Sequence, residues 1–382
     1  MNRQAIPLLL ALLLPLPAAE WARVKECSGQ VTVSVAGDDG STLRSSPVRA
    51  AQVIAAGQVL SAGPDGRAVL ELDDGSLLEL AKGSRLSLGG RENDGATKTF
   101  FTLLTGQVVA RVKKLSASDT FQIATPTAIA GVRGTVFSVS VAESGDALIG
   151  VQEGTVEVED ADAVEETGGQ PLTLAAKESA QIGLAGNPQK GSGFELGKHS
   201  YERWNAERQK QLLANLPGVL DALEKRFLLT AKAVAIGEEL LRRDGKALLL
   251  LHARIEASKK GGPSVGNDDL ELRKKMFLRV AKVGAFHKLM GARLQAYGPV
   301  LAKIYQLGKD DPRVRQRMEG FRKNAEGALK GIEERRRNAA KEMESQRLEW
   351  KEKFGEARSD GKGEGKKEPG DRDERKAGGP AD

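Results

Sequence analysis

The chain has 382 residues, of which 29% are charged and 4% aromatic, and its formal net charge is +6 at pH 7. This length accommodates two or three domains with cores of their own. A single cysteine, Cys27, excludes an internal disulfide, and the three histidines, His199, His252 and His287, are too widely separated to give a metal-binding spacing. We therefore expect a protein that is not an enzyme and that uses no metal or cofactor.

Residues 1–19 have the pattern of a secretory signal peptide, because Arg3 is followed by an apolar run that ends in small residues. Prolines at positions 7, 15 and 17 make this run a poor membrane-spanning helix. Cleavage after Ala19 is the preferred interpretation, and an uncleaved anchor is the alternative. The longest later apolar run, Ala247–Leu251, has five residues, so we expect an exported protein that is soluble or peripherally attached.

Charge divides the chain into two halves. Residues 20–190 contain 15 Lys+Arg and 22 Asp+Glu, a net charge of −7, whereas residues 191–382 contain 42 and 30, a net charge of +12. The default interpretation is that the basic half simply presents a solvated, charged face. The more specific alternative is attraction to the acidic half or to an anionic surface. Nucleic acid is a poor partner for an exported protein, and no small-molecule substrate is evident.

Residues 20–185 alternate apolar and polar residues in short runs, the pattern of an all-β domain. A glycine precedes a β-branched run at Gly29, Gly106 and Gly154, so a bend is expected before each of these strands. The spacing of the runs fits a rolled β-sandwich and a short β-solenoid equally well. Asp73–Asp74 is interpreted as a turn rather than a calcium loop, because the regular ligand spacing of such loops is missing.

The alternation is most regular in residues 121–160. One face of a half-buried strand there is apolar and is predicted to face the core: Phe137, Val139 and Val141. Just before this strand, Arg133 lies between Gly131 and Gly134, which permit tight backbone geometry. The preferred interpretation is that Arg133 bonds carbonyls and carboxylates of its own domain; the alternative is contact with an anion or a partner.

This half of the chain, about residues 27–185, resembles the FecR-domain family of bacterial envelope proteins. The family hallmark is Thr-Pro followed by Val-Arg-Gly-Thr-x-Phe, and a later Glu-Gly-x-Val closes the pattern. The matching residues are Thr125, Pro126, Val132, Arg133, Gly134, Thr135, Phe137, Glu153 and Gly154. The resemblance implies exposure in the periplasm or cell envelope and recognition of a protein, and we expect these residues to shape the fold more than to contact a ligand.

The resemblance does not extend to the design of the family's namesake, which spans the inner membrane and relays the state of an outer-membrane receptor to a cytoplasmic sigma factor. In this sequence we find neither an anti-sigma segment before the domain nor an internal transmembrane helix. Control of a sigma factor is therefore not transferred to this chain.

Residues 186–197 are rich in glycine and are predicted to be a linker. From residue 198 to 355, apolar residues recur at spacings of three and four, which predicts an α-helical bundle whose first stripe runs from Leu212 to Leu228. Helix boundaries are expected at Gly261–Asn267, Asp268–Asp269, Pro299, Gly308 and Asp311–Pro312. Residues 356–382 lack apolar periodicity and are predicted to be disordered.

Together these patterns predict a non-enzymatic exported envelope protein. Its β domain is expected to bind a protein or a cell-wall polymer, and its basic helical domain to serve assembly or attachment, including peripheral contact with an anionic surface. The alternative is an extracytoplasmic signal-sensing regulator that acts through a membrane partner. A second alternative is an uncharacterised envelope enzyme.

Overall fold

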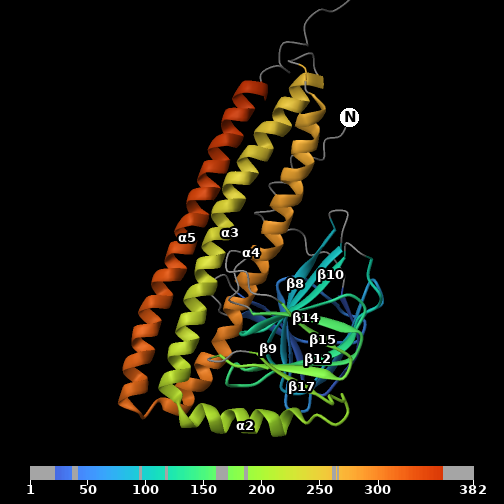
Figure 1. Ribbon diagram of the computed structural model, residues 1–382. Helices are drawn as coiled ribbons and strands as arrows, with labels where there is room; N and C mark the ends of the chain where they lie inside the picture. Colours follow the sequence, from blue (N-terminus) through green and yellow to red (C-terminus); the bar gives the residue numbers. More distant parts are fainter. Residues whose placement is uncertain are drawn as a thin grey trace, which may run out of the picture. The chain divides into compact units, whose positions relative to one another are not determined.

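The computed structural model describes residues 22–36, 42–93, 97–116, 119–160, 171–184, 188–259, 264 and 266–355. Residues Met1–Arg335 form one compact unit, and Arg336–Asp382 form a second. In the first unit a strand-rich half precedes a helical half, which confirms the predicted order of β and α structure (Figure 1). The predicted signal peptide and C-terminal tail lie outside the described residues.

The strand-rich half contains strands β1 to β17. Their bounds are Ala22–Ser28 (β1), Val31–Ala36 (β2), Thr42–Pro47 (β3), Val53–Ile54 (β4), Gln58–Ala62 (β5), Arg67–Leu72 (β6), Leu77–Leu80 (β7), Arg85–Asn93 (β8), Thr97–Arg111 (β9), Thr120–Ala124 (β10), Ala128–Val132 (β11), Val136–Val141 (β12), Ala147–Glu153 (β13), Thr155–Asp160 (β14), Leu172–Ala175 (β15), Glu178–Ile182 (β16) and Gln189–Ser192 (β17).

These strands form two sheets that share the long strand β9. Sheet A has the order β4-β1-β6-β7-β9-β12-β13-β16-β17. Sheet B has the order β3-β2-β5-β8-β9-β10-β11-β14-β15. The pairing of β9 with β10 is parallel and the other pairings are antiparallel. Of the two predicted architectures, this is the rolled sandwich, because a solenoid would stack its successive coils in parallel.

The predicted glycine bends are the points where the chain passes from one sheet to the other. Gly29, Gly106 and Gly154 all have positive φ, of 64°, 90° and 85°. At Gly106 the strand β9 continues through the bend, and an added Cβ would lie 2.2 Å from the Oγ of Ser84, so only glycine fits. The bends are therefore confirmed, and crossing between the sheets is their physical reason.

The core of the β half lies between the two sheets. The ring of Phe121 is 5.5 Å from that of Phe101 and 6.5 Å from that of Phe137, which reaches across from sheet A. The predicted inward face of β12 is confirmed, since Phe137, Val139 and Val141 are fully buried. Its outward face differs from the prediction, because Ser138 and Ser140 are also buried. Strand β12 is thus covered on both faces rather than half-buried.

The helical half contains four described helices, α2 (Tyr201–Ala214), α3 (Leu216–Lys259), α4 (Asn267–Gly308) and α5 (Pro312–Gly355). None of the described helices combines the length and apolarity that crossing a membrane requires. The expected starts at Asp268–Asp269 and Pro312 are confirmed within one residue. The Asp311 carboxylate caps α5 by accepting a hydrogen bond from the backbone N–H of Arg313 at 2.8 Å.

Two predicted helix boundaries need correction. The stripe expected from Leu212 to Leu228 is divided at Asn215, whose side-chain oxygen accepts a hydrogen bond from the Gly218 N–H at 3.1 Å and caps α3. Pro299 does not interrupt α4, which continues to Gly308. Gly308 ends α4 as expected, and an added Cβ there would lie 2.5 Å from the side chain of Val314.

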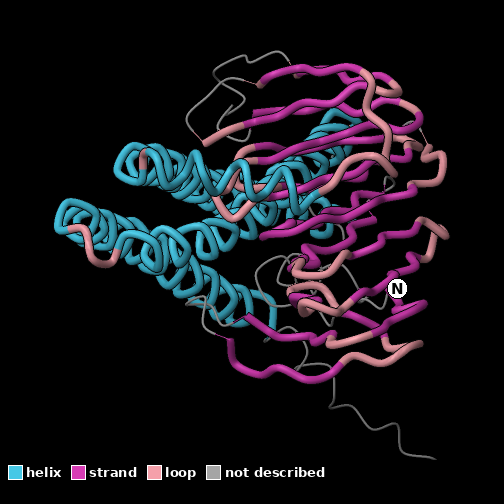
Figure 2. The backbone as a smooth tube through the Cα atoms, turned by 90° about the horizontal axis from the view of Figure 1, so that it is seen from below, coloured by secondary structure: helices cyan, strands magenta, loops and turns pink. Residues whose placement is uncertain are grey.

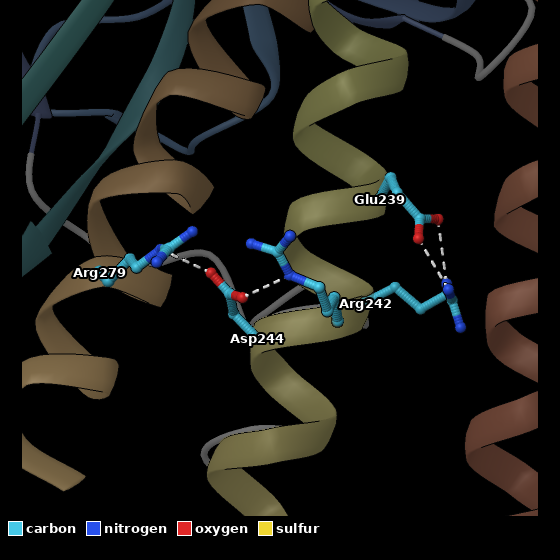
Figure 3. Close-up of polar contacts among 5 residues, drawn as sticks. Glu239, Arg242, Asp244 and Arg279 are labelled. Carbon is cyan, nitrogen blue, oxygen red and sulfur yellow. Dashed lines mark hydrogen bonds and ion pairs between the residues drawn. The ribbon is translucent and has the colours of Figure 1, made fainter. Parts of the chain in front are cut away.

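Helices α3, α4 and α5 pack together as the predicted bundle. The ring of Phe227 on α3 lies 5.9 Å from that of Tyr297 on α4 and 5.4 Å from that of Phe321 on α5. Farther along, the nearly buried carboxylate of Asp244 on α3 accepts a hydrogen bond from its neighbour Arg243 and lies 2.7 Å from the Nε of Arg279 on α4 (Figure 3). Aromatic packing and this ion pair therefore hold the bundle at different levels.

The bundle packs directly on the β half. Helix α4 contacts β8 and β9 of sheet B. Figure 2 draws the helices in cyan and the strands in magenta. Phe100, Ala124 and Ile129 of sheet B belong to the same buried cluster as the bundle core. The segment predicted as the linker 186–197 contains strand β17, which pairs with β16, so this part of the prediction was wrong. The unpaired edge of β16 accounts for the added strand.

Candidate functional site

The candidate site is built around strand β11, because the two parts of the Thr-Pro/Val-Arg-Gly-Thr pattern lie at its two ends. Residues 125–128, here called the Thr-Pro turn, connect β10 to β11. Residues 132–135, here called the Arg133 corner, carry the chain from β11 in sheet B to β12 in sheet A. Since β11 has five residues at about 3.3 Å each, the two ends lie about 16 Å apart.

The Thr-Pro turn is closed by its own side chain. Thr125 is fully buried, and its Oγ1 accepts a hydrogen bond from the Ala128 N–H at 2.8 Å and donates one to the Ala128 carbonyl at 2.9 Å. Thr127, also fully buried, donates from its Oγ1 to the Ile182 carbonyl at 3.2 Å. Proline at position 126 has no N–H to satisfy and presets the turn. The Thr-Pro turn is therefore a rigid internal element of the fold.

A buried arginine from the helical half contacts this turn. Arg293 on α4 is 0% exposed, and its Nη2 and Nε donate to the Pro126 carbonyl at 2.9 Å and 3.3 Å. Its guanidinium carbon also lies 5.7 Å from the ring centre of Tyr297. A buried guanidinium is stable only with such acceptors, so Arg293 and the Pro126 carbonyl depend on each other.

A second arginine docks α3 on the β half beside this turn. Arg226 donates from its Nε to the Leu184 carbonyl at 2.7 Å. The Leu184 N–H donates in turn to the Asp146 carboxylate at 3.1 Å. Burial raises the pKa of Asp146, although the hydrogen bond from Leu184 and the nearby positive charges of Arg208 and Arg226 act in the opposite direction.

The turn between β12 and β13 is held by side chains from α2 and α4. The Glu143 carboxylate lies 2.6 Å from the Nζ of Lys303 on α4 and accepts a hydrogen bond from Gln209 on α2. The hydroxyl of Tyr201 on α2 donates to the Val141 carbonyl at 3.0 Å, and burial raises the pKa of this tyrosine to about 12. Side chains of α2, α3 and α4 therefore contact the β half at three places: the Thr-Pro turn, the Leu184 carbonyl and the turn between β12 and β13.

The Arg133 corner faces solvent. Arg133 is exposed, and within the described part of the chain its side chain makes no hydrogen bond or ion pair. The preferred prediction, that it bonds groups of its own domain, therefore has no support in this geometry. The exposed Lys114 lies against the corner, because an added Cβ on Gly134 would be 2.9 Å from the Cα of Lys114, whereas the Nζ of Lys113 lies beside Gly75 in the turn between β6 and β7. The corner therefore presents the positive charges of Arg133 and Lys114, and the exposed carboxylates of Glu153 and Glu157 belong to the neighbouring strands.

The remaining motif residues set the shape of the Arg133 corner. Gly134 has a φ of 92°, and an added Cβ on Gly154 would lie 2.9 Å from the Gly134 carbonyl, so the two glycines stack closely. Thr135 donates from its Oγ1 to the Thr155 carbonyl at 3.0 Å. Val132 is buried, whereas Glu153 is exposed beside the stacked glycines. The corner thus presents charged side chains on a rigid backbone.

Other candidate residues are placed apart from this site. His199 lies near the Trp204 ring, and burial lowers its pKa, while the Nε2 of His287 is 3.3 Å from the Oε1 of Glu238 in the bundle. The Asp74 carboxylate accepts a hydrogen bond from the Ser76 N–H at 2.7 Å, as expected of a turn. Among the residues that the structure describes, no three His, Cys, Asp or Glu side chains are placed to hold a metal ion.

Sequence reasoning missed Arg293 and Arg226, the two arginines that join the halves. A signal for Arg293 was present, because it stands three positions after Met290 and four before Tyr297, both nearly fully buried. A charged residue within a buried helical stripe requires a hydrogen-bond partner. The identity of that partner, a carbonyl 167 positions earlier, has no signature in the sequence.

Comparison with known proteins supports the predicted resemblance. Residues 58–157 match the family model described as FecR protein. No curated protein matches the chain. Two crystal structures, at 1.65 Å and 2.50 Å resolution, of a protein from Parabacteroides distasonis ATCC 8503 proposed to be an anti-sigma factor share 18% identity with this chain, with a TM-score of 0.30. Each match covers 35% of this chain and 59% of that protein, so the chain spans less than two thirds of its length.

Proposed function

We propose that this chain, whose residues 58–157 form a FecR domain, is a non-enzymatic extracytoplasmic binding protein. Its β half recognises a protein in the cell envelope, and its helical half serves assembly or attachment. The observation that carries this proposal is Arg133. It is exposed at one end of the family motif and makes no hydrogen bond or ion pair with any described residue, while the other end of the motif is buried.

The chemistry of the Arg133 corner favours an anionic partner group. A guanidinium presents a planar fork of donors that matches a carboxylate. Lys114 adds positive charge beside it, and the closely stacked glycines Gly134 and Gly154 keep the backbone rigid. A rigid backbone loses little conformational freedom on binding, so the ordering cost falls on the arginine and lysine side chains. We therefore expect a partner that presents Asp or Glu side chains.

The test is partner recovery with the full chain and two single variants. Arg133→Ala removes the exposed guanidinium, whereas Arg49→Ala removes an exposed arginine elsewhere on the β half. We expect the Arg133 variant to lose the partner and the Arg49 variant to retain it, with unfolding midpoints like that of the parent chain. Equal recovery by both variants would show that Arg133 belongs to the scaffold and that the proposal is wrong.

A second candidate function is signal sensing, in which binding at the Arg133 corner changes a contact made by the helices. The contact between Pro126 and Arg293 favours it, because five residues of β11 join that contact to the corner. In this case Arg293→Lys should keep partner binding but change a stimulus-dependent crosslink to a membrane protein in cells. An unchanged response in a folded variant would favour the binding role alone.

A further inference from the structure

Helices α3 and α4 form an antiparallel hairpin, and the described residues 242–259 and 266–282 on either side of its turn, here called the hairpin tip, combine features that the binding role does not use. Two ion pairs define the register of the hairpin. Arg254 lies 3.4 Å from Asp269 near the turn, and Arg279 lies 2.7 Å from Asp244 farther down. Residues near 250 on α3 are therefore level with residues near 272 on α4.

The hairpin tip is strongly basic. The hairpin tip contains 10 Lys+Arg and 5 Asp+Glu, a net charge of +5. Its charged side chains reach solvent: Lys274, Arg254 and Arg279 are 67%, 61% and 57% exposed. The tip is therefore a positive field that attracts anionic surfaces.

The same tip exposes large apolar side chains. Leu250, Leu278, Leu272 and Leu270 are 66%, 58%, 48% and 37% exposed, whereas other exposed apolar side chains, such as Leu213 on α2, are separated from one another along the described chain. Leu270, Lys274 and Leu278 follow each other at spacings of four and so lie along one face of α4. Leucine and lysine therefore alternate along the outer surface of this helix.

We propose that the hairpin tip binds the surface of an anionic lipid bilayer. Leucines that enter the headgroup region lose contact with water, while neighbouring lysines keep their charges at the lipid phosphates. A polyanionic wall polymer would give no favourable burial of the leucines, and an uncharged apolar partner would give none of the charge attraction. The inference deepens the attachment role proposed above and is independent of the Arg133 corner.

The first test measures co-sedimentation of the full chain with phosphatidylcholine vesicles that contain or lack phosphatidylglycerol. We expect binding only when phosphatidylglycerol is present, weakened by added salt. Lys274→Glu/Lys275→Glu should weaken this binding by about tenfold or more. The matched control, Lys210→Glu/Lys323→Glu, makes the same charge change on α2 and α5, where both lysines are exposed and lie near glutamates. The control should change binding little.

The second test separates the leucines from the charges. Leu270→Ser/Leu278→Ser, which removes the two leucines on the face of α4 that carries Lys274, should weaken vesicle binding by about tenfold, and Leu213→Ser, which removes an exposed leucine from α2, should not. Absence of vesicle binding, equal binding to both kinds of vesicle, or equal losses in test and control variants would overturn the proposal. A concentration-dependent change in sedimentation of the parent chain, removed by the leucine variant without any effect on vesicle binding, would instead assign the tip to self-association.

The two proposals fail separately. Arg133→Ala should leave vesicle binding unchanged, because the corner is in the β half and the tip is in the bundle. Loss of vesicle binding in Lys274→Glu/Lys275→Glu with retained partner recovery would support the lipid contact and leave the protein-binding role intact. Failure to recover any partner with a chain that still binds vesicles would affect only the binding role.

Discussion

The two ends of strand β11 use arginine in opposite ways. At the Thr-Pro turn, the completely buried Arg293 of α4 donates to the Pro126 carbonyl, so the motif serves as a docking point for the helices. At the Arg133 corner, the motif's own arginine is exposed and makes no hydrogen bond or ion pair with any described residue. The one sequence pattern therefore contains a buried contact with the helices and an exposed arginine, about 16 Å apart.

The comparison shows that an arginine's energetic role depends on its surroundings. Burial removes a guanidinium from water, so each of its donors must find an acceptor inside the protein. An exposed guanidinium keeps its hydration and contributes little to stability. The buried end is therefore expected to determine how the halves stay together, and the exposed end to determine what the protein contacts.

The largest expected effect comes from replacing the two arginines in turn. Arg293→Ala should lower the free energy of unfolding by about 3 kcal/mol, because the Pro126 carbonyl loses a charged donor and a cavity forms. Arg133→Ala should change it by less than about 0.5 kcal/mol. Urea unfolding followed by circular dichroism gives both values. Similar losses of unfolding free energy in the two variants would show that Arg293 and Arg133 contribute equally to stability and would contradict the comparison.

A smaller effect is expected within the Arg133 corner itself. Gly134→Ala should lower the free energy of unfolding by about 2 kcal/mol. The φ of 92° at Gly134 disfavours a side chain, and the new Cβ would meet the backbone of Lys114. Gly131→Ala is the matched control, since the nearest atom to its added Cβ is the Glu157 carbonyl oxygen at 3.8 Å. Gly131→Ala should leave the free energy of unfolding unchanged. Thermal unfolding measures both variants, and equal losses of stability would contradict a rigid Arg133 corner.

The smallest effect concerns pH at the docked side. Burial raises the pKa of Asp146, so the folded protein binds more protons than the unfolded chain between the ordinary and the raised pKa. This contribution makes stability fall as pH rises through that window. Asp146→Asn keeps an oxygen for the Leu184 N–H and removes the titration, so its stability should depend less on pH there and should match or exceed that of the parent at neutral pH.

The measurement is the free energy of unfolding at several pH values from acid to neutral. Glu178→Gln provides a contrast, because hydrogen bonds from Lys190 and from the Ala175 N–H lower the pKa of that half-buried carboxyl. The Glu178 carboxyl makes the free energy of unfolding rise with pH, whereas Asp146 makes it fall, so the two substitutions should change the pH dependence in opposite directions. A parent chain and an Asp146 variant with parallel pH curves would show that the docked side does not bury this charge.

Local patterns predicted most of the elements. The apolar face of β12 and the bends at Gly29, Gly106 and Gly154 follow from alternation and from the backbone freedom of glycine, which depend on neighbouring residues alone. The start of α5 follows from the Asp311 cap for the same reason. The linker prediction failed because the pairing of β17 with the edge of β16 is a contact that composition does not reveal.

The sequence by itself determined the β-then-α order, the resemblance of the β half to the FecR family, the opposite charges of the two halves and the residues of the motif. Only the tertiary structure decided that Pro126 is buried under α4 while Arg133 stays in solvent, and that leucines and lysines meet on the outer face of the hairpin tip. The physical reason is the separation along the chain over which each interaction acts. Periodicity and capping act over a few residues, whereas the burial of a side chain depends on segments far away in the chain, as Arg293 and Pro126 show.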